Sequence, residues 1–306
     1  MKGAAMTQRR STRVGMLPAV LLVCLLLAAP LFAMAQAIDL RDDRGTEHRF
    51  DAPPKRIVTL LPSLTESVWV LGGGARIVGV DRYSNWPVEL SHLPRLGGLD
   101  DAQIEAIAAL KPDVILASTS ARAIDRLEGL GFRVLRLRSE TYADVRRTLD
   151  LLAALLGTPA AGERLWAEID RQIAAAAARV PKSQRGRRVY FELGGGPYAA
   201  GTTSFIGETL GRLGMTNIVP ASLGPFPKLN SEFVLRAKPD IVMGIDREMN
   251  AMAARPGWGE LPAVRDRQRC AFTASDYEML IRSGPRLGEA AAVVANCLEN
   301  LEAVRR

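Results

Sequence analysis

One twelve-residue pattern occurs twice in this chain, at 105–116 and again 127 residues later at 232–243. In each copy a glutamate begins a short amphipathic segment, Lys-Pro-Asp follows it, and a run rich in β-branched residues comes next. Because proline interrupts a helix and β-branched residues favour strands, each copy predicts a helix followed by a buried strand. Two such copies predict two similar α/β lobes, and two lobes that face each other predict a cleft between them.

The first 35 residues have the composition of a secretory signal peptide. Four basic residues precede a nearly unbroken apolar run, Leu17–Phe32, and a small-x-small cleavage pattern stands at 33–35. The run holds about 16 residues, fewer than the ~20 that cross a bilayer, so cleavage is favoured over a membrane anchor. The sequence therefore predicts a soluble, exported mature chain.

Removal of this segment changes what the charge implies. The whole chain has a formal net charge of +7, and four of its positive charges lie in residues 1–35, which leaves about +3. So small a charge gives no support to nucleic-acid binding. The chain has only two histidines, His48 and His92, both expected at the surface. A Ser-His-Asp triad and a histidine-rich zinc site are therefore excluded, and no metal site is predicted.

Two cysteines, Cys270 and Cys297, remain once the signal segment has taken Cys24 with it. An even pair in an oxidising compartment favours a disulfide. The bridge would join a late strand to the last helix, and two separate buried thiols are the alternative.

Strand and helix patterns alternate along most of the chain. The first lobe, 36–140, begins with a predicted exposed hairpin at 38–50 and continues with strands at 56–61, 77–80, 114–117 and 134–137. The second lobe, 186–306, has predicted strands at 187–193, 217–219, 241–243 and 270–272. Strands that alternate with helices predict parallel sheets with helices on their faces.

A purely helical connector, 141–185, separates the two lobes. One amphipathic helix is predicted at 142–156, and a second begins with Thr158 as N-cap and Pro159 as its first residue. The second helix ends near Val180, and its ~22 residues give a length of roughly 33 Å. A helix of this length predicts a rigid spacer rather than a flexible linker.

Candidate binding residues lie where the predicted strands end, because open α/β sheets bind ligands beyond the carboxyl ends of their strands. Pro62 and Ser63 follow the first strand, and Tyr83 and Trp86 follow the second. Phe226 stands at the matching place in the second lobe, again followed by proline. These aromatic residues suit a large, flat, partly apolar ligand, and the alternative for Trp86 and Phe226 is a place in the core.

Three more residues belong to the predicted site. Tyr277 and Arg282 follow the last strand, and Tyr198 comes just after a loop of three glycines. The competing class is an exported α/β enzyme that uses a cleft carboxylate, Glu192 or Asp81, and turnover without a partner would identify it. A structural adaptor with two filled lobes and no cleft is the third class.

Glu105 and Glu232 begin the two copies of the repeated pattern. The helix dipole favours acidic residues in a first turn, and this is enough to explain both. The alternative is a matched pair of negative points that docks onto a partner with two equivalent basic pockets, such as a dimeric membrane protein.

Together these segments resemble the periplasmic metal-chelate binding proteins of ABC importers over nearly the whole mature chain, most of all the corrinoid (vitamin B12 type) binders. The similarity lies in 56–66, 78–87, the two Glu…Lys-Pro-Asp segments, 275–277 and 285–286. The resemblance implies a class III periplasmic binding protein, in which two α/β lobes are joined by one long helix. It also implies a non-catalytic, monomeric receptor without a cofactor, whose cleft closes only slightly around a metal chelate.

The resemblance further implies roles for individual residues. Tyr83 would contact the ligand, and Glu105 and Glu232 would bind arginines of an inner-membrane permease dimer that works with its ATPase. Capture in the cleft, docking and release into the permease would follow one another.

The chain departs from the corrinoid binders at three positions, because Leu99, Phe226 and Tyr277 stand where those proteins have tryptophan. Haem-binding relatives place an iron-ligating tyrosine near Leu99, and leucine cannot ligate iron. The aromatic wall is therefore reduced, and a corrinoid remains the leading ligand, either of the vitamin B12 type or a corrinoid precursor. A ferric siderophore, facing cleft residues such as Arg282, and haem are the alternatives.

Overall fold

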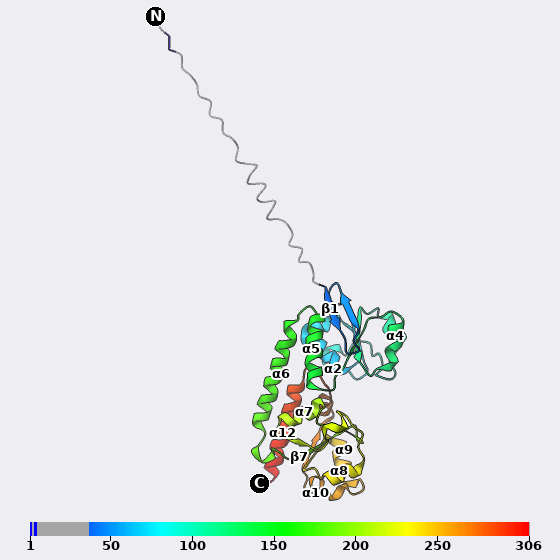
Figure 1. Cartoon of the computed structure of the whole chain (residues 1–306), viewed down its shortest axis with the longest axis vertical. Coiled ribbons are helices and arrows are strands. Elements are labelled where there is room, and N and C mark those ends of the chain that lie inside the picture. The colour runs from blue at the N-terminus through cyan, green and yellow to red at the C-terminus, as the bar shows by residue number, and fades with distance from the viewer. Residues whose placement is uncertain (2, 5–36, 306) are drawn as a thin grey trace. The chain divides into compact units, whose positions relative to one another are not determined.

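The computed structural model describes residues 1, 3–4 and 37–305 (Figure 1). The predicted signal peptide therefore falls outside the described residues, apart from three residues at the start of the chain. Residues Ala37–Arg306 form one unit that holds both sheets. Within the described ranges, every helix is too short or too polar to span a bilayer.

Four parallel strands form the first sheet, in the order β4-β3-β5-β6. They are β3 (Ile57–Thr59), β4 (Ile77–Val80), β5 (Val114–Ser118) and β6 (Val134–Leu137). The predicted hairpin, β1 (Ile38–Arg41) with β2 (Glu47–Phe50), precedes them. All three residues of β3 are buried, as expected for the inner strand of a parallel sheet with helices on its faces.

The second sheet has the order β11-β10-β7-β8, and β9 also pairs with β7. Its strands are β7 (Arg188–Leu193), β8 (Tyr198–Ala199), β9 (Thr216–Asn217), β10 (Ile241–Ile245) and β11 (Arg269–Phe272). The pairing is parallel except for the short strand β8, which the sequence did not predict. The predicted fold class, with two similar parallel-sheet α/β lobes, is confirmed.

Short helices follow the strands and cover the sheets. They are α2 (Pro62–Val68), α3 (Ile104–Ala109), α4 (Asp125–Gly129), α7 (Phe205–Arg212), α8 (Ser231–Ala237), α9 (Asp246–Ala251), α10 (Pro262–Arg265) and α11 (Ala274–Leu280). Each sheet packs one face onto its own small core, and the remaining buried side chains join in a larger core that also includes the long helices.

Three long helices connect the lobes: α5 (Tyr142–Leu155), α6 (Ala160–Arg179) and α12 (Leu287–Arg305). Helix α6 packs against both of the others, as Figure 1 shows. Its 20 residues give a length of about 30 Å, close to the predicted spacer. The predicted cap is wrong, because Thr158 donates a side-chain hydrogen bond back to a carbonyl at the end of α5 and does not cap α6.

The predicted disulfide is confirmed. Cys270 in β11 is bonded to Cys297 in α12. The bridge ties the edge strand of the second sheet to the last helix, which packs on α6.

The Lys-Pro-Asp part of the repeated pattern has a structural explanation. In both copies the lysine ends a helix in the left-handed conformation, with φ of 45° at Lys111 and 46° at Lys238. The aspartate two residues later accepts a backbone hydrogen bond from the residue that precedes or begins a strand, Arg56 (2.9 Å) or Arg188 (2.7 Å). The side chain of the same arginine donates to a carbonyl at the end of the helix. None of these contacts involves the glutamate that begins each copy.

The prediction of surface exposure is wrong for one of the two histidines. His92 is exposed as predicted, but His48 is buried, with its Nε2 3.3 Å from Asp42 Oδ2. In the β1–β2 hairpin, alternate residues face inward, and His48 takes an inward position beside the buried carboxylate.

A buried tyrosine joins α5 to α7 and gives the fold a pH dependence. The hydroxyl of Tyr142 lies 2.6 Å from Thr209 Oγ1, and burial raises the pKa of Tyr142 to about 12. Between pH 10 and 12 the unfolded chain loses this proton while the folded chain keeps it, so stability falls as pH rises.

As the pH rises from 10 to 12, we expect the free energy of unfolding of the Tyr142→Phe variant to fall by about 2–3 kcal/mol less than that of the wild type. Urea unfolding of both proteins across pH 9–12 measures it. Parallel stability curves for the two proteins over this range would contradict the prediction.

Candidate functional site

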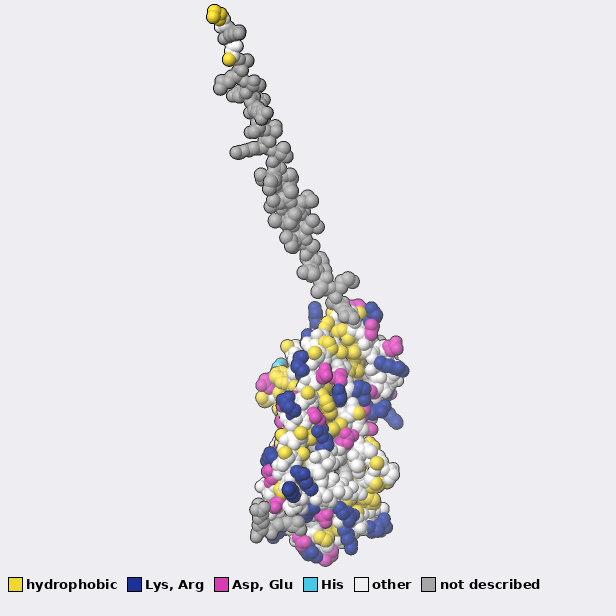
Figure 2. Space-filling view, turned by 60° about the vertical axis from the view of Figure 1, so that its left-hand side comes forward, with side chains coloured by type: hydrophobic (Ala, Val, Ile, Leu, Met, Phe, Trp, Pro, Cys, Tyr) yellow, Lys and Arg dark blue, Asp and Glu magenta, His cyan; other side chains and the backbone are white. Residues whose placement is uncertain are grey.

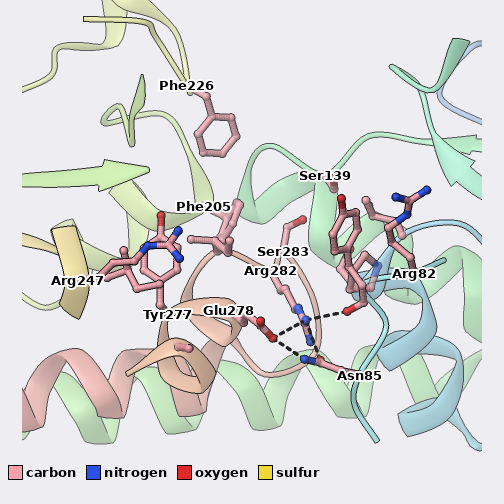
Figure 3. A pocket seen from close by; sticks show the side chains of 17 residues that line it. Arg82, Asn85, Ser139, Phe205, Phe226, Arg247, Tyr277, Glu278, Arg282 and Ser283 are labelled. Carbon is pink, nitrogen blue, oxygen red and sulfur yellow. Dashed lines mark hydrogen bonds and ion pairs between the residues drawn. The ribbon is translucent and has the colours of Figure 1, made fainter. Parts of the chain in front are cut away.

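A cavity of about 780 Å³, here called the cleft cavity, lies between the two sheets at the carboxyl ends of their parallel strands (Figure 3). On the first-sheet side its wall is formed by Pro62 and Ser63 after β3 and by Tyr83 after β4. On the second-sheet side it is formed by residues that include Phe226 and Tyr277. The predicted cleft is therefore present, at the place where parallel α/β sheets bind ligands.

Six of the nine predicted ligand-binding residues line the cleft cavity: Pro62, Ser63, Tyr83, Phe226, Tyr277 and Arg282. Leu99 lines an adjacent cavity of about 440 Å³, which shares Pro62 and Tyr83 with the first. Trp86 and Tyr198 line neither cavity. Trp86 is half-buried with the guanidinium of Arg286 4.6 Å from its ring centre, and Tyr198 lies in β8.

Several lining residues were not predicted. Sequence reasoning missed Asn85, Ser139, Phe205, Ile245, Arg247 and Glu278. Ser139 closely follows β6, and Ile245 and Arg247 stand at the end of β10. The rule that identified Pro62 and Ser63, which selects residues just after a strand, would have found these three as well.

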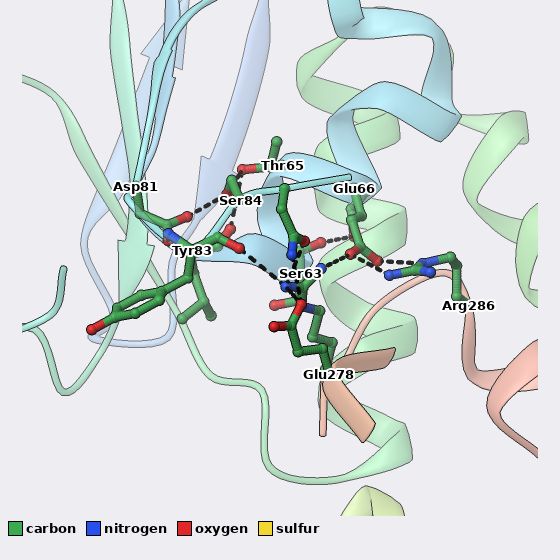
Figure 4. Close-up of polar contacts among 12 residues, drawn as sticks. Ser63, Thr65, Glu66, Asp81, Tyr83, Ser84, Glu278 and Arg286 are labelled. Atoms are coloured by element: carbon green, nitrogen blue, oxygen red, sulfur yellow. Dashed lines mark hydrogen bonds and ion pairs between the residues drawn. The ribbon is translucent and has the colours of Figure 1, made fainter. Parts of the chain in front are cut away.

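Tyr83 is the most exposed aromatic residue of the cavity, with 62% of its surface accessible. Its backbone N–H donates to Asp81 Oδ1 at 2.7 Å, and Ser84 donates to the other oxygen of the same carboxylate (Figure 4). Burial raises the pKa of Asp81, although these hydrogen bonds oppose the shift. Asp81 therefore fixes the backbone of the turn after β4, while the phenol ring of Tyr83 remains exposed.

Tyr277 forms the opposite wall and is buried. Its hydroxyl accepts from the N–H of Gly194 at 2.7 Å and donates to the carbonyl of Glu192 at 3.3 Å. Burial raises the pKa of Tyr277 above its ordinary value. Tyr277 thus ties the glycine loop to α11, and it also lines the cavity.

An ion cluster of Glu66, Arg282 and Arg286 adjoins the cavity through Arg282, and Figure 4 shows the contact between Glu66 and Arg286. Arg282 donates to Glu66 Oε1 at 2.8 Å, and Arg286 donates to both carboxylate oxygens at 2.7 and 2.9 Å. Glu66 lies in α2, and the arginines lie between α11 and α12, so the cluster joins the two lobes.

Arg282 also holds the ligand-facing loop. Its second nitrogen donates to the carbonyl of Tyr83 at 3.0 Å and to Asn85 Oδ1 at 2.9 Å (Figure 3). The sequence suggested a cationic group that faces an anionic chelate. Arg282 does line the cavity, but its guanidinium is engaged by protein acceptors.

Ser63 lines the cavity, and its hydroxyl has an unusual environment. Its Oγ is buried and has no hydrogen-bond partner among the described residues. A buried hydroxyl without a partner costs free energy.

The carboxylates of the enzyme alternative are both engaged. Glu192 lies outside the cleft cavity and forms a two-point ion pair with Arg255, at 2.5 and 2.8 Å. Asp81 lines only the adjacent cavity and is bonded within its own turn. In the described part of the chain, no group of three or more His, Cys, Asp or Glu side chains is arranged to hold a metal ion.

The two glutamates of the repeated pattern are exposed. Glu105 lies 3.4 Å from Arg126 in a pair whose side chains are 80% and 69% accessible. Among the described residues, Glu232 takes part in no ion pair. Both stand in the first turn of their helices, α3 and α8, away from the cleft cavity.

Comparisons with known proteins agree with this geometry. The family described as Periplasmic binding protein matches residues 57–275. The cobalamin-binding protein of Halobacterium salinarum is 30% identical over 272 residues, covering 85% of this chain and 73% of that protein.

Two solved structures of periplasmic binding proteins are similar to this chain over most of its length. The periplasmic vitamin B12-binding protein of Vibrio cholerae superimposes with a TM-score of 0.67 at 26% identity, over 82% of this chain and 98% of that one. The apo form of a periplasmic haem-binding protein from Roseiflexus sp. RS-1 gives a TM-score of 0.69 at 26% identity, over 81% and 98%.

Proposed function

The chain belongs to the periplasmic binding protein family, and we propose that it is a receptor whose ligand is a corrinoid of the vitamin B12 type. Members of this family are solute-binding proteins of ABC importers and not enzymes. The receptor captures its ligand in the cleft cavity and delivers it to a permease.

The cleft cavity is the observation that carries the proposal. Its volume, about 780 Å³, lies in the upper part of the range for small-molecule sites and suits a ligand far larger than a metal ion. Its wall combines nine aromatic or aliphatic residues with eight polar or charged ones. A corrinoid carries its own metal and presents amide side chains, so it needs apolar surface and hydrogen bonds rather than protein ligands to cobalt.

The proposal extends to location and partners. Export through cleavage of residues 1–35 places the receptor in the periplasm, where the Cys270–Cys297 disulfide is stable. Glu105 and Glu232 dock onto basic residues of the permease dimer, which takes its energy from an associated ATPase. The lobe connections support a small lobe movement, because α6 and the Glu66 ion cluster both resist wide opening.

Titration of the mature protein with cyanocobalamin by calorimetry tests the ligand, with haemin and a ferric hydroxamate as parallel ligands. We expect one-to-one binding of the corrinoid. The Tyr83→Ala variant should bind it about 10- to 100-fold more weakly, since ~1.5–3 kcal/mol of aromatic contact is lost. Tyr83→Phe should bind nearly as well as the wild type.

The same variant separates the corrinoid from haem. The exposed phenol of Tyr83 is also placed to ligate haem iron, which makes haem the second candidate. In that case haemin binds instead, and Tyr83→Phe loses both affinity and the visible spectrum of an iron–phenolate complex. Binding of neither compound, with a signal for the ferric hydroxamate alone, would overturn the corrinoid assignment.

A further inference from the structure

Three arginines line the cleft cavity, and one of them differs from the other two. Arg282 donates to oxygen atoms on both sides of the cavity, and Arg82 donates to the carboxylate of Asp101. Among the described residues, no acceptor receives a hydrogen bond from the guanidinium of Arg247. Of the three, Arg247 is therefore the one whose N–H groups are available to a ligand.

The ion pair of Arg247 leaves most of its guanidinium unoccupied. Its Nε lies 3.5 Å from Oε1 of Glu248, longer than the hydrogen-bond distances of about 2.7–3.2 Å. The two terminal nitrogens have no acceptor among the described residues, and the side chain is 75% accessible. So exposed and long a pair adds little to stability, so the fold gives no strong reason for an arginine at this position.

The position of Arg247 in the fold directs it to the cavity. It is the second residue of α9, which follows β10 directly, and the carboxyl ends of parallel strands are where α/β sheets bind ligands. Figure 3 shows its guanidinium extending from the end of β10 into the cavity beside Tyr277, on the opposite side from Arg82. A ligand in the cleft cavity would therefore meet its terminal nitrogens.

The charges around Arg247 are balanced. Glu248 is shared with Arg255, which donates to it at 3.2 Å and also forms two hydrogen bonds to Glu192. Two guanidinium groups thus face two carboxylates. Glu278, the one carboxylate among the residues that line the cavity, is paired with an arginine of its own. An anionic group at Arg247 would meet no unpaired carboxylate, and its attraction would come from the free N–H groups.

A corrinoid of the vitamin B12 type carries one anionic group, the phosphodiester that links the corrin ring to the nucleotide base. Its other polar groups are uncharged amides and hydroxyls. A guanidinium can donate two parallel hydrogen bonds to a phosphate, and such charge-assisted bonds are stronger than those to an amide. The phosphate is therefore the part of this ligand that gains most from Arg247.

We propose, on the premise that the cleft ligand is a corrinoid, that Arg247 binds the phosphate of its nucleotide loop. Arg247 is then a specificity-determining residue. It lets the receptor distinguish a complete corrinoid from a precursor that has no phosphate.

Calorimetry with three corrinoids and the mature protein tests this role. Cobinamide and cobinamide phosphate differ only in the phosphate, and cyanocobalamin adds the nucleoside; cyanide is the axial ligand in all three. We expect the wild type to bind the two phosphate-bearing compounds about 10-fold more tightly than cobinamide. Arg247→Gln should lose this preference and keep the wild-type affinity for cobinamide, which also shows that the variant is folded.

Arg265→Gln is the matched control. Arg265 also pairs with the carboxylate of the next residue, Asp266, its side chain is 61% accessible, and it lines neither the cleft cavity nor the adjacent one. This variant removes the same charge and should keep the preference for phosphate.

The outcomes separate this inference from the proposed function. A wild type that binds all three corrinoids equally overturns the inference and leaves the corrinoid receptor in place. A preference that survives in Arg247→Gln, or that is lost equally in Arg265→Gln, overturns the role of Arg247. A wild type that binds none of the three overturns the proposed function and this inference with it.

Discussion

Replacement of Glu66 by alanine is expected to lower the free energy of unfolding by roughly 3–5 kcal/mol, because it leaves buried arginines without their carboxylate. The Glu66 side chain is 1% accessible, and those of Arg282 and Arg286 are 9% and 14% accessible. Arg286 forms ion pairs only with Glu66 among the described residues, and it would keep only its contact with Trp86. Urea unfolding followed by circular dichroism measures the loss.

Glu278→Ala is the matched control for this prediction. Glu278 also bonds Arg282, at 3.1 Å, but its side chain is 43% accessible. An exposed pair contributes about 0–1 kcal/mol, so this variant should lose little stability. Equal losses in the two variants would show that the burial of Glu66 has no special effect.

The same cluster also affects ligand binding. Arg282 donates to the carbonyl of Tyr83, so a displaced Arg282 releases the loop that presents the phenol ring. Glu66→Ala should therefore weaken the binding of the cleft ligand, although Glu66 does not line the cavity. Unchanged affinity would mean that Asp81, Thr65 and Arg95 hold the loop after β4 without Arg282.

The sequence predicted the fold well because the relevant signals are local. The β-branched runs at 114–117 and 241–243 are β5 and β10, and the helix ends beside them depend on Lys-Pro-Asp. Strand ends also located Pro62, Ser63 and Tyr83 in the wall of the cavity. Each of these inferences uses residues within a few positions of each other.

Two of the failures involve contacts between distant residues. Glu66 lies 216 and 220 positions from its arginines, so nothing near it in the sequence indicates that it is buried in an ion cluster. Trp86 follows a strand as the ligand-binding candidates do, yet Arg286 packs over its ring. The error at His48 is local, because its partner Asp42 is six residues away and the alternation of the hairpin turns position 48 inward.

Reversal of both repeat charges, in the double variant Glu105→Lys/Glu232→Lys, is expected to lower ligand uptake on the order of 100-fold, since like charges at a docking interface cost several kcal/mol. The Lys-Pro-Asp contacts explain the rest of the repeated pattern without either glutamate, and a favourable first-turn position is the structural explanation that remains for both. Stability should hardly change, because only the exposed Glu105–Arg126 pair is lost. Uptake of labelled ligand by cells that carry the variant in place of the wild type measures the effect.

The control must carry the same change of charge in the same structural position. Glu163 and Glu289 are also exposed first-turn glutamates, in α6 and α12, and Glu163→Lys/Glu289→Lys provides that match. Neither residue of the test pair lines the cleft cavity, so calorimetry should give wild-type ligand affinity for both double variants. Equal uptake by the two double variants would show that the loss of uptake comes from the change in net charge and not from the positions of Glu105 and Glu232. A loss of affinity in Glu105→Lys/Glu232→Lys would place these glutamates in ligand capture and remove the docking role.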